Sequence, residues 1–334
     1  AETFAEVQDK AIREVVVMQE SLGLKGVTDG EFRRSSYWGH WVEAIEGLDV
    51  APSLFTFHDD CGTEQEFIAA TCTGTLKQTA PISTGEFAFL HSVASATPKI
   101  TLPSPSTLHF WRLDQTIAGS GYASAEAYLA DLIAIYRQEI AALYDLGCRY
   151  VQLDEVPLIM LANPENRARV TAFGSDPAKL RTLYIEALNQ TVAERPADMT
   201  AALHICRGNF KGKWLTEGGY DDIAEAVFQG VDVDGFFLEF DTQRAGGFEA
   251  LRHVPSGKKV VLGLVSSKIG QIEDPIVIRK RVEEAARYLP IESLSISPQC
   301  GFASTVAGNP ITEQHQIDKL AALVQLAEEI WGAG

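Results

Sequence analysis

The feature that most constrains this chain is a regular alternation of short apolar runs with segments of helical periodicity. Seven runs are apolar on both faces, as buried parallel strands are: residues 25–30, 99–106, 149–156, 199–206, 233–241, 258–267 and 293–300. Because helices lie between these runs, each strand returns to the sheet through a helix, and the sheet is parallel. The pattern predicts a (β/α)8 (TIM) barrel, with residues 1–334 forming a single domain.

The predicted helices begin at clear capping signals. Asp176-Pro177 and Asp274-Pro275 each place an N-cap acid before a proline of the first turn. Ser124 and Thr312 can cap two further helices, the second of which ends the chain. These signals place helices where the barrel requires them.

Two features depart from a plain barrel. The chain opens with a helical pattern over residues 4–16, and only seven strands follow. We therefore expect the first of the eight strands to lie upstream of residue 1. Within residues 47–97, the stretches 66–79 and 86–94 alternate apolar and polar side chains, which predicts an inserted β-hairpin.

Charge and cysteine content exclude several classes of function. The formal net charge is −17, so the surface repels phosphate backbones and we expect no nucleic-acid partner. No run of about 18 apolar residues occurs, so we expect no membrane span. Five cysteines in 334 residues are too few for a disulfide framework and favour a reducing, cytoplasmic setting.

His204 and Cys206 stand two residues apart in a predicted strand, so they project from the same face. Such a pair can ligate one metal ion, but Cys and His also lie together in protein cores without any chemical role. The barrel favours the first alternative, because its catalytic groups lie at the carboxyl ends of strands. The residues at these ends include Asp29, Glu31, Asp154, Glu155, His204, Cys206, Glu239, Asp241 and Cys300.

The ligand set of His204, Cys206 and Cys300, with Glu239 as the fourth candidate, suits zinc in type and number. Zinc bound by two thiolates is a poor Lewis acid for hydrolysis, because the thiolates already donate charge to it. It is well suited to holding a third, external thiol as a reactive thiolate. A carboxylate in the fourth position can leave when the substrate sulfur arrives, whereas a closed structural site would show paired C-x2-C spacing.

Five motifs carry a resemblance to a known family: VTDGEFRR (27–34), QLDE (152–155), HICRGNF (204–210), FFLEFD (236–241) and SPQCGFAST (297–305). Together they resemble the catalytic barrel of the cobalamin-independent methionine synthases. The chain is most similar to the short, single-barrel relatives known as methionine synthase II. The resemblance runs from the first helix to the last, and its three ligand motifs follow one another at three strand ends.

The resemblance implies a zinc-dependent S-methyltransferase that moves a methyl group to the thiol of homocysteine and forms methionine. It implies that the zinc ligands are His204, Cys206, Glu239 and Cys300. It implies that Glu31 and Asp154 hold the amino group of homocysteine in the catalytic site. A Gly-Ser motif that binds the substrate carboxylate in the family would lie upstream of residue 1.

Two departures from the family leave the methyl donor open between methyltetrahydrofolate and a methyl-corrinoid. Full-length folate-using enzymes carry a second, N-terminal barrel, which these 334 residues do not include. Those enzymes also end the seventh strand with an Asp-x-His pattern linked to proton delivery. This chain has Ser266 and Lys268 there, so the acid that a methylfolate leaving group needs must come from elsewhere.

Three alternatives remain. The same zinc chemistry would serve an alkyltransferase acting on another small thiol such as coenzyme M, although Glu31 and Asp154 favour a thiol with an amino group. A zinc-free decarboxylase of the uroporphyrinogen decarboxylase type shares the fold but requires arginines for its many carboxylates. A non-enzymatic zinc store would give the acidic residues no role. We expect a small thiol and a methyl donor as binding partners. The sequence is compatible with a homodimer but does not determine the oligomeric state.

Overall fold

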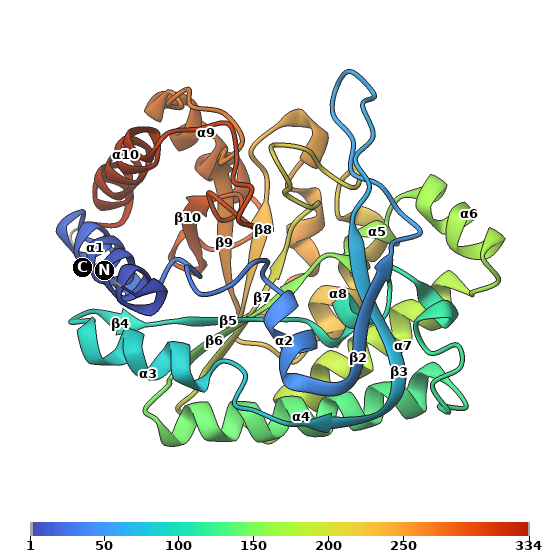
Figure 1. Ribbon diagram of the computed structural model, residues 1–334. Helices are drawn as coiled ribbons and strands as arrows, with labels where there is room; N and C mark the ends of the chain where they lie inside the picture. The colour runs from blue at the N-terminus through green and yellow to red at the C-terminus, as the bar shows by residue number, and fades with distance from the viewer. Residues whose placement is uncertain (1–2, 333–334) are drawn as a thin grey trace.

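The structure, a computed structural model, describes residues 3–332 and has a row of parallel strands at its centre (Figure 1). Six of them pair in chain order: β5 (Ile100–Pro103), β6 (Tyr150–Glu155), β7 (Thr200–Ile205), β8 (Gly235–Glu239), β9 (Lys259–Val265) and β10 (Leu294–Pro298). Every neighbouring pair is parallel. The row extends by one strand, because β4 (Thr97–Pro98) stands one residue before β5 and pairs in parallel with β1 (Gly26–Val27).

This strand order confirms the predicted (β/α)8 barrel fold class. All seven runs that the sequence marked as strands are strands in the structure. Residues 151–153 of β6 and 201–205 of β7 are buried on both faces, as predicted. Within residues 3–332, no strand pairs with the outer edge of β10 or of β1. The strand expected upstream of residue 1 lies outside the described residues and stays a prediction.

Helices cover the outside of the strands (Figure 1). The side chains of Ser124, Asp176, Asp274 and Thr312 each accept a hydrogen bond from a backbone N–H of the following turn, which confirms the four predicted caps. The long helices are α1 (Phe4–Ser21), α4 (Ala125–Asp145), α7 (Pro177–Val192), α8 (Asp221–Gly230), α9 (Pro275–Ala285) and α10 (Glu313–Trp331). The short ones are α2 (Gly39–Ala44), α5 (Pro157–Met160) and α6 (Pro164–Ala172).

The insertion is a hairpin followed by a helix. Strands β2 (Ile45–Pro52) and β3 (Ile68–Gln78) pair antiparallel, which confirms an inserted hairpin and the strand predicted at 66–79. The prediction of a second strand at 86–94 is wrong, because the partner strand is β2 and residues 86–94 lie in and just after α3 (Thr84–Val93). The cap of α3 comes from α4, where the buried Glu139 carboxylate accepts the backbone N–H groups of Ser83 and Thr84 at 2.6 and 3.0 Å. The capping carboxylate of α3 therefore belongs to a residue in another helix, and the sequence around the start of α3 does not indicate it.

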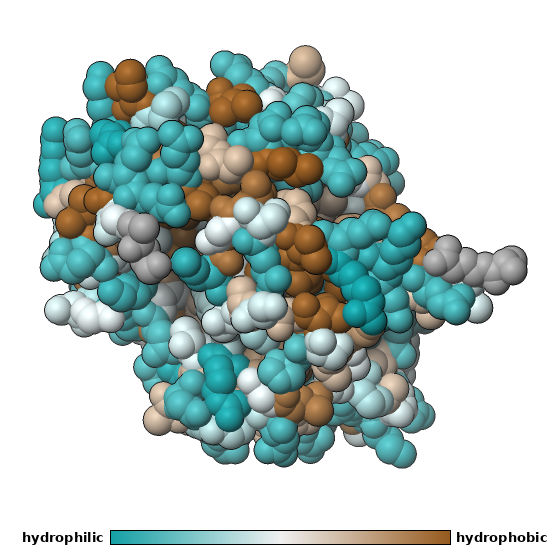
Figure 2. All heavy atoms as spheres, turned by 90° about the vertical axis from the view of Figure 1, so that its left-hand side faces the viewer, coloured by the Kyte–Doolittle hydropathy of each residue, from teal (hydrophilic) through white to brown (hydrophobic). Residues whose placement is uncertain are grey.

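Figure 2 turns the side that carries α1 and α10 toward the viewer. Hydrophobic side chains lie there in separate patches between hydrophilic ones. In α1 the side chains of Phe4, Val7 and Val17 are exposed, whereas Ile12 and Val16 of the same helix are fully buried. No helix within residues 3–332 is both long enough and apolar enough to span a membrane.

Candidate metal centre

A cavity of about 1380 Å³ opens at the carboxyl ends of the strands. It brings together the predicted site residues except Glu239, namely Glu31, Asp154, His204, Cys206 and Cys300. Asp154 lies in β6 and His204 in β7, and these two residues are paired in register. Cys206 follows β7 directly, and Cys300 follows β10. The strand-end rule therefore brought together residues from four of the five motifs.

His204, Cys206 and Cys300 form a group whose ligand atoms all lie within 4.8 Å of one another. His204 and Cys206 are buried, and the Nε2 atom of His204 has no hydrogen-bond partner among the described residues. Tetrahedral zinc with bonds of about 2.0–2.3 Å holds its ligand atoms about 3.5–4 Å apart, so only a small contraction is needed. One imidazole nitrogen and two sulfurs are donors that zinc prefers, and the group fits that metal.

The two thiols ionise unequally. The closeness of the two thiols raises the pKa of Cys206 and lowers the pKa of Cys300 well below its ordinary value. Burial alone would lower the pKa of His204, but the neighbouring Cys300 outweighs it and raises that pKa. The environment therefore favours the thiolate form on Cys300 over Cys206.

Glu239 stands close to this group but has other partners. It lies at the end of β8, is fully buried, and is not one of the residues that line the cavity. Its Oε2 atom accepts the backbone N–H of Arg207 at 2.7 Å, and its Oε1 atom lies 3.7 Å from Nζ of Lys268. The 4.8 Å group among the described residues does not include it. The role of Glu239 as a fourth ligand stays a prediction.

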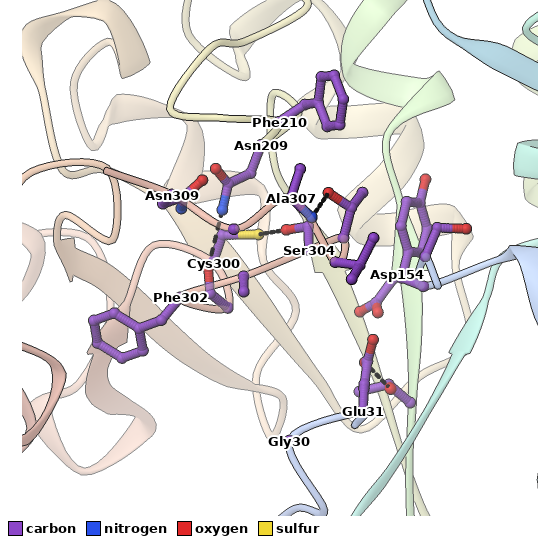
Figure 3. A pocket seen from close by; sticks show the side chains of 18 of the residues that line it. Gly30, Glu31, Asp154, Asn209, Phe210, Cys300, Phe302, Ser304, Ala307 and Asn309 are labelled. Atoms are coloured by element: carbon purple, nitrogen blue, oxygen red, sulfur yellow. Dashed lines mark hydrogen bonds between the residues drawn. The ribbon is translucent and has the colours of Figure 1, made fainter. Parts of the chain in front are cut away.

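Glu31 and Asp154 face each other within the cavity (Figure 3). Glu31 has a φ of 56°, and its Oε1 atom accepts the Thr101 hydroxyl at 2.5 Å. Asp154 Oδ1 accepts the amide of Gln152 at 2.7 Å. Burial, helped by the charge of Glu31, raises the pKa of Asp154 to about 6. Two facing carboxylates, one of which is poorly solvated, make a site for an ammonium group.

The sequence did not identify the residues that hold these carboxylates. Thr101 bonds Glu31, and Gln152 bonds Asp154. Lys99, whose pKa burial lowers to about 8, donates to Gln152 Oε1 at 3.0 Å. One signal was present, because Gln152 and Asp154 stand two apart in a strand, the same relation that singled out the predicted metal ligands of β7.

The arginines near the site are engaged by other groups of the protein. Arg34 Nη2 forms a 2.7 Å ion pair with Glu86, and its Nη1 atom lies 3.4 Å from Oε1 of Glu31. Arg207 is fully buried and donates to the backbone carbonyl oxygens of Gly218 and Ala245. No arginine is among the described residues that line the cavity. The cavity therefore lacks the guanidinium groups that a substrate with several carboxylates requires.

A loop after β10 places Cys300. The Asn209 side chain donates to the carbonyl oxygen of Gly301 at 2.9 Å, and the Ser304 hydroxyl lies 3.8 Å from the sulfur of Cys300 (Figure 3). Asn209 follows the HIC ligand motif, so the loop after β7 directly supports the loop after β10. The two segments that carry the candidate sulfur ligands are thus joined directly by a hydrogen bond.

Comparison with known proteins finds relatives over nearly the whole chain. Residues 1–329 match the family described as "Cobalamin-independent synthase, Catalytic domain". An uncharacterized protein of Bacillus subtilis (strain 168), YxjH, is 41% identical, with the match covering 99% of this chain and 87% of that protein. A methionine synthase of Pyrococcus abyssi is 26% identical over 90% of this chain and 78% of that protein.

A solved structure shares the fold. It comes from Listeria monocytogenes and is provisionally named a vitamin-B12-independent methionine synthase. Its TM-score with this chain is 0.74 and its sequence identity 33%, and the match covers 98% of this chain and 88% of that one.

Proposed function

The chain belongs to the cobalamin-independent synthase family by its catalytic domain, and from this premise we propose that it transfers a methyl group to homocysteine on a zinc site, forming methionine. The observation that carries the proposal is the group of His204, Cys206 and Cys300 in a cavity that also holds Glu31 and Asp154. Relatives named methionine synthase support the reaction type.

The proposed mechanism divides the substrate between the two parts of the cavity. Zinc, when bound by His204, Cys206 and Cys300, supplies the means of keeping a substrate thiol deprotonated at neutral pH. Glu31 and Asp154 accept hydrogen bonds from the ammonium group and thereby orient the sulfur. A carbon–sulfur bond then forms as the bond between the methyl group and its donor breaks, and the donor leaves with the electron pair.

The walls of the cavity suit a methyl donor with a large apolar surface. Aromatic side chains from the hairpin region and the strand loops line it: Trp38, Phe57, Phe67, Trp111 and Phe210. Phe57 contacts Phe67 and Phe210, with ring centroids 5.0 and 5.4 Å apart. This lining provides apolar surface on which a planar donor can stack. Methyltetrahydrofolate and a methyl-corrinoid both remain donors under this proposal.

Two features weigh against the alternatives. A sulfonate-bearing thiol such as coenzyme M would place its anion against the carboxylates of Glu31 and Asp154, whose two negative charges exceed the one positive charge of Lys99 in the same wall. A decarboxylase of the uroporphyrinogen decarboxylase type would need arginines, and none lines the cavity in the described part of the chain. We therefore favour homocysteine as the thiol.

The test is metal content combined with zinc X-ray absorption, with and without homocysteine. We expect one zinc per chain with two sulfur neighbours, and a third sulfur neighbour after homocysteine is added. Zinc that ignores homocysteine but gains a sulfur from coenzyme M would favour the alkyltransferase. A protein purified in zinc-containing buffer without stoichiometric metal would refute the proposal.

A further inference from the structure

Two opposite charges meet behind the candidate metal ligands, and neither belongs to the cavity wall. Glu239 is fully buried and Lys268 is 6% exposed. The Oε1 atom of Glu239 and the Nζ atom of Lys268 lie 3.7 Å apart, and neither has a hydrogen-bond partner among the described residues. Charged atoms at this depth are costly unless they are paired. The Glu239 carboxylate and the Lys268 ammonium group therefore form an ion pair with each other, although no direct hydrogen bond joins them.

The nearby guanidinium group cannot replace Lys268 as the partner of Glu239. The Arg207 side chain donates to the carbonyl oxygens of Gly218 and Ala245, and only its backbone N–H reaches the Glu239 carboxylate. Lys268 is the one cationic side chain within 4.0 Å of that carboxylate in the described part of the chain. The position of Oε1 is thus governed by the ammonium group of Lys268.

Lys268 is itself attached to the loop that carries a sulfur ligand. The preceding residue, Ser267, donates its N–H and its hydroxyl to the Gln299 side chain, and its carbonyl oxygen accepts the Asn309 amide at 2.9 Å. Gln299 directly precedes Cys300. Lys268 is therefore attached through Ser267 to the segment that carries Cys300, and its ammonium group lies beside the Glu239 carboxylate.

We propose that Lys268 is a positioning residue whose ammonium group holds the Glu239 carboxylate away from the fourth coordination position, so that the substrate thiol can take it. The inference rests on the proposed zinc and thiol chemistry and adds a role for a residue outside the ligand set. Two thiolates already neutralise the two positive charges of zinc. A buried carboxylate beside them is thus held either by the metal or by Lys268, and Lys268 sets the balance.

Asp241 offers a matched control for the charge of Lys268. It stands two residues after Glu239, does not line the cavity, and its carboxylate oxygens have no hydrogen-bond partner among the described residues. Removing its charge leaves the ammonium group of Lys268 beside Glu239.

The experiment compares Lys268→Met, Lys268→Arg and Asp241→Asn with the parent protein, each loaded with zinc or with cobalt(II). Three quantities are measured: metal affinity by chelator competition, the metal shell by X-ray absorption, and homocysteine affinity from the cobalt–thiolate absorption. Circular dichroism and thermal melting establish that each variant is folded. Only the third quantity involves substrate, so metal binding is followed independently of activity.

We expect Lys268→Met to bind metal about tenfold more tightly, to gain one oxygen ligand, and to bind homocysteine about tenfold more weakly. Lys268→Arg and Asp241→Asn should stay within about threefold of the parent, since both keep a cation beside Glu239. Adding Glu239→Gln to Lys268→Met should restore homocysteine binding, because the competing carboxylate is gone.

Three results would overturn the inference. One is a Lys268→Met protein with the metal shell and affinities of the parent. Another is a parent metal shell that already contains an oxygen ligand which Glu239→Gln removes. The third is a Lys268→Met defect that Glu239→Gln does not relieve. A parent protein that binds no metal, or whose metal ignores thiols, refutes the proposed function instead and is recognised before any variant is made.

Discussion

The Asp154 carboxylate should lower the stability of the fold but strengthen the binding of homocysteine. The variant Asp154→Asn allows the two effects to be measured separately. Burial raises the pKa of this carboxyl from its ordinary value of 3.8 to about 6. The folded protein therefore holds the Asp154 proton more tightly than the unfolded chain does. At pH 7, where the group is charged in both states, this difference destabilises the fold by about 1–3 kcal/mol.

The sign of the effect fixes its pH dependence. The destabilisation is fully present above the folded pKa of about 6 and is relieved as the pH falls toward 3.8. Asp154→Asn keeps an oxygen that can accept the Gln152 amide but carries no charge. We therefore expect the metal-free variant to be more stable than the parent by about 1–3 kcal/mol at pH 7.5, and by clearly less at pH 5.

Urea unfolding of metal-free parent and variant at these two pH values measures the gain, and homocysteine titration of the zinc-loaded proteins measures the loss. The substrate should bind at least about tenfold more weakly to the variant, because a charged acceptor of the ammonium group is lost. A variant that is less stable than the parent at pH 7.5, or equally more stable at both pH values, would refute the assignment of the pKa to burial. Unchanged homocysteine binding would show that the Asp154 carboxylate does not hold the amino group.

Four further predictions follow from the described contacts. Glu31→Gln should raise the KM for homocysteine about tenfold at unchanged zinc content, as steady-state kinetics and metal analysis will show. Cys300→Ser should lower zinc affinity at least about tenfold in a chelator competition, because one of three grouped ligands is weakened. Glu139→Gln should destabilise the protein by about 2–3 kcal/mol in urea without changing zinc affinity, since the cap of α3 loses its charge. If a methylfolate is a donor, a triglutamate tail should give no lower KM than a monoglutamate, because the carboxylates of Glu43, Asp49 and Glu66 also line the cavity.

The barrel could be predicted because its signals are local. Strands buried on both faces are apolar along their whole length, and caps such as Asp176 and Thr312 act within one turn of the residues they precede. The error at residues 86–94 has the opposite origin. Phe87 and Leu90 are buried three residues apart on a helix whose cap, Glu139, stands in another helix. A short stretch of this kind fits a strand or a helix until its distant partner is known.

The candidate site could be predicted in part, since the grouping of its residues follows from strand ends but the orientation of Glu239 does not. A rule about strand ends was enough to bring His204, Cys206 and Cys300 together, because the ends of parallel strands share one edge of the sheet. The placement of Glu239 was not predictable, since it depends on whether the carboxylate turns toward the ligands or toward Lys268. That choice is set by side chains from two different loops, and no spacing within the sequence encodes it.

The positions of the two candidate sulfur ligands would have a mechanical consequence if they share a metal ion. Cys206 follows β7 and Cys300 follows β10, with β8 and β9 between them in the sheet. An ion shared by these two cysteines fastens the middle of the chain to its last strand across a long loop, as a removable cross-link does. The C-terminal third of the barrel could then not unfold locally without releasing the ion. Resistance to proteases would therefore increase with metal occupancy.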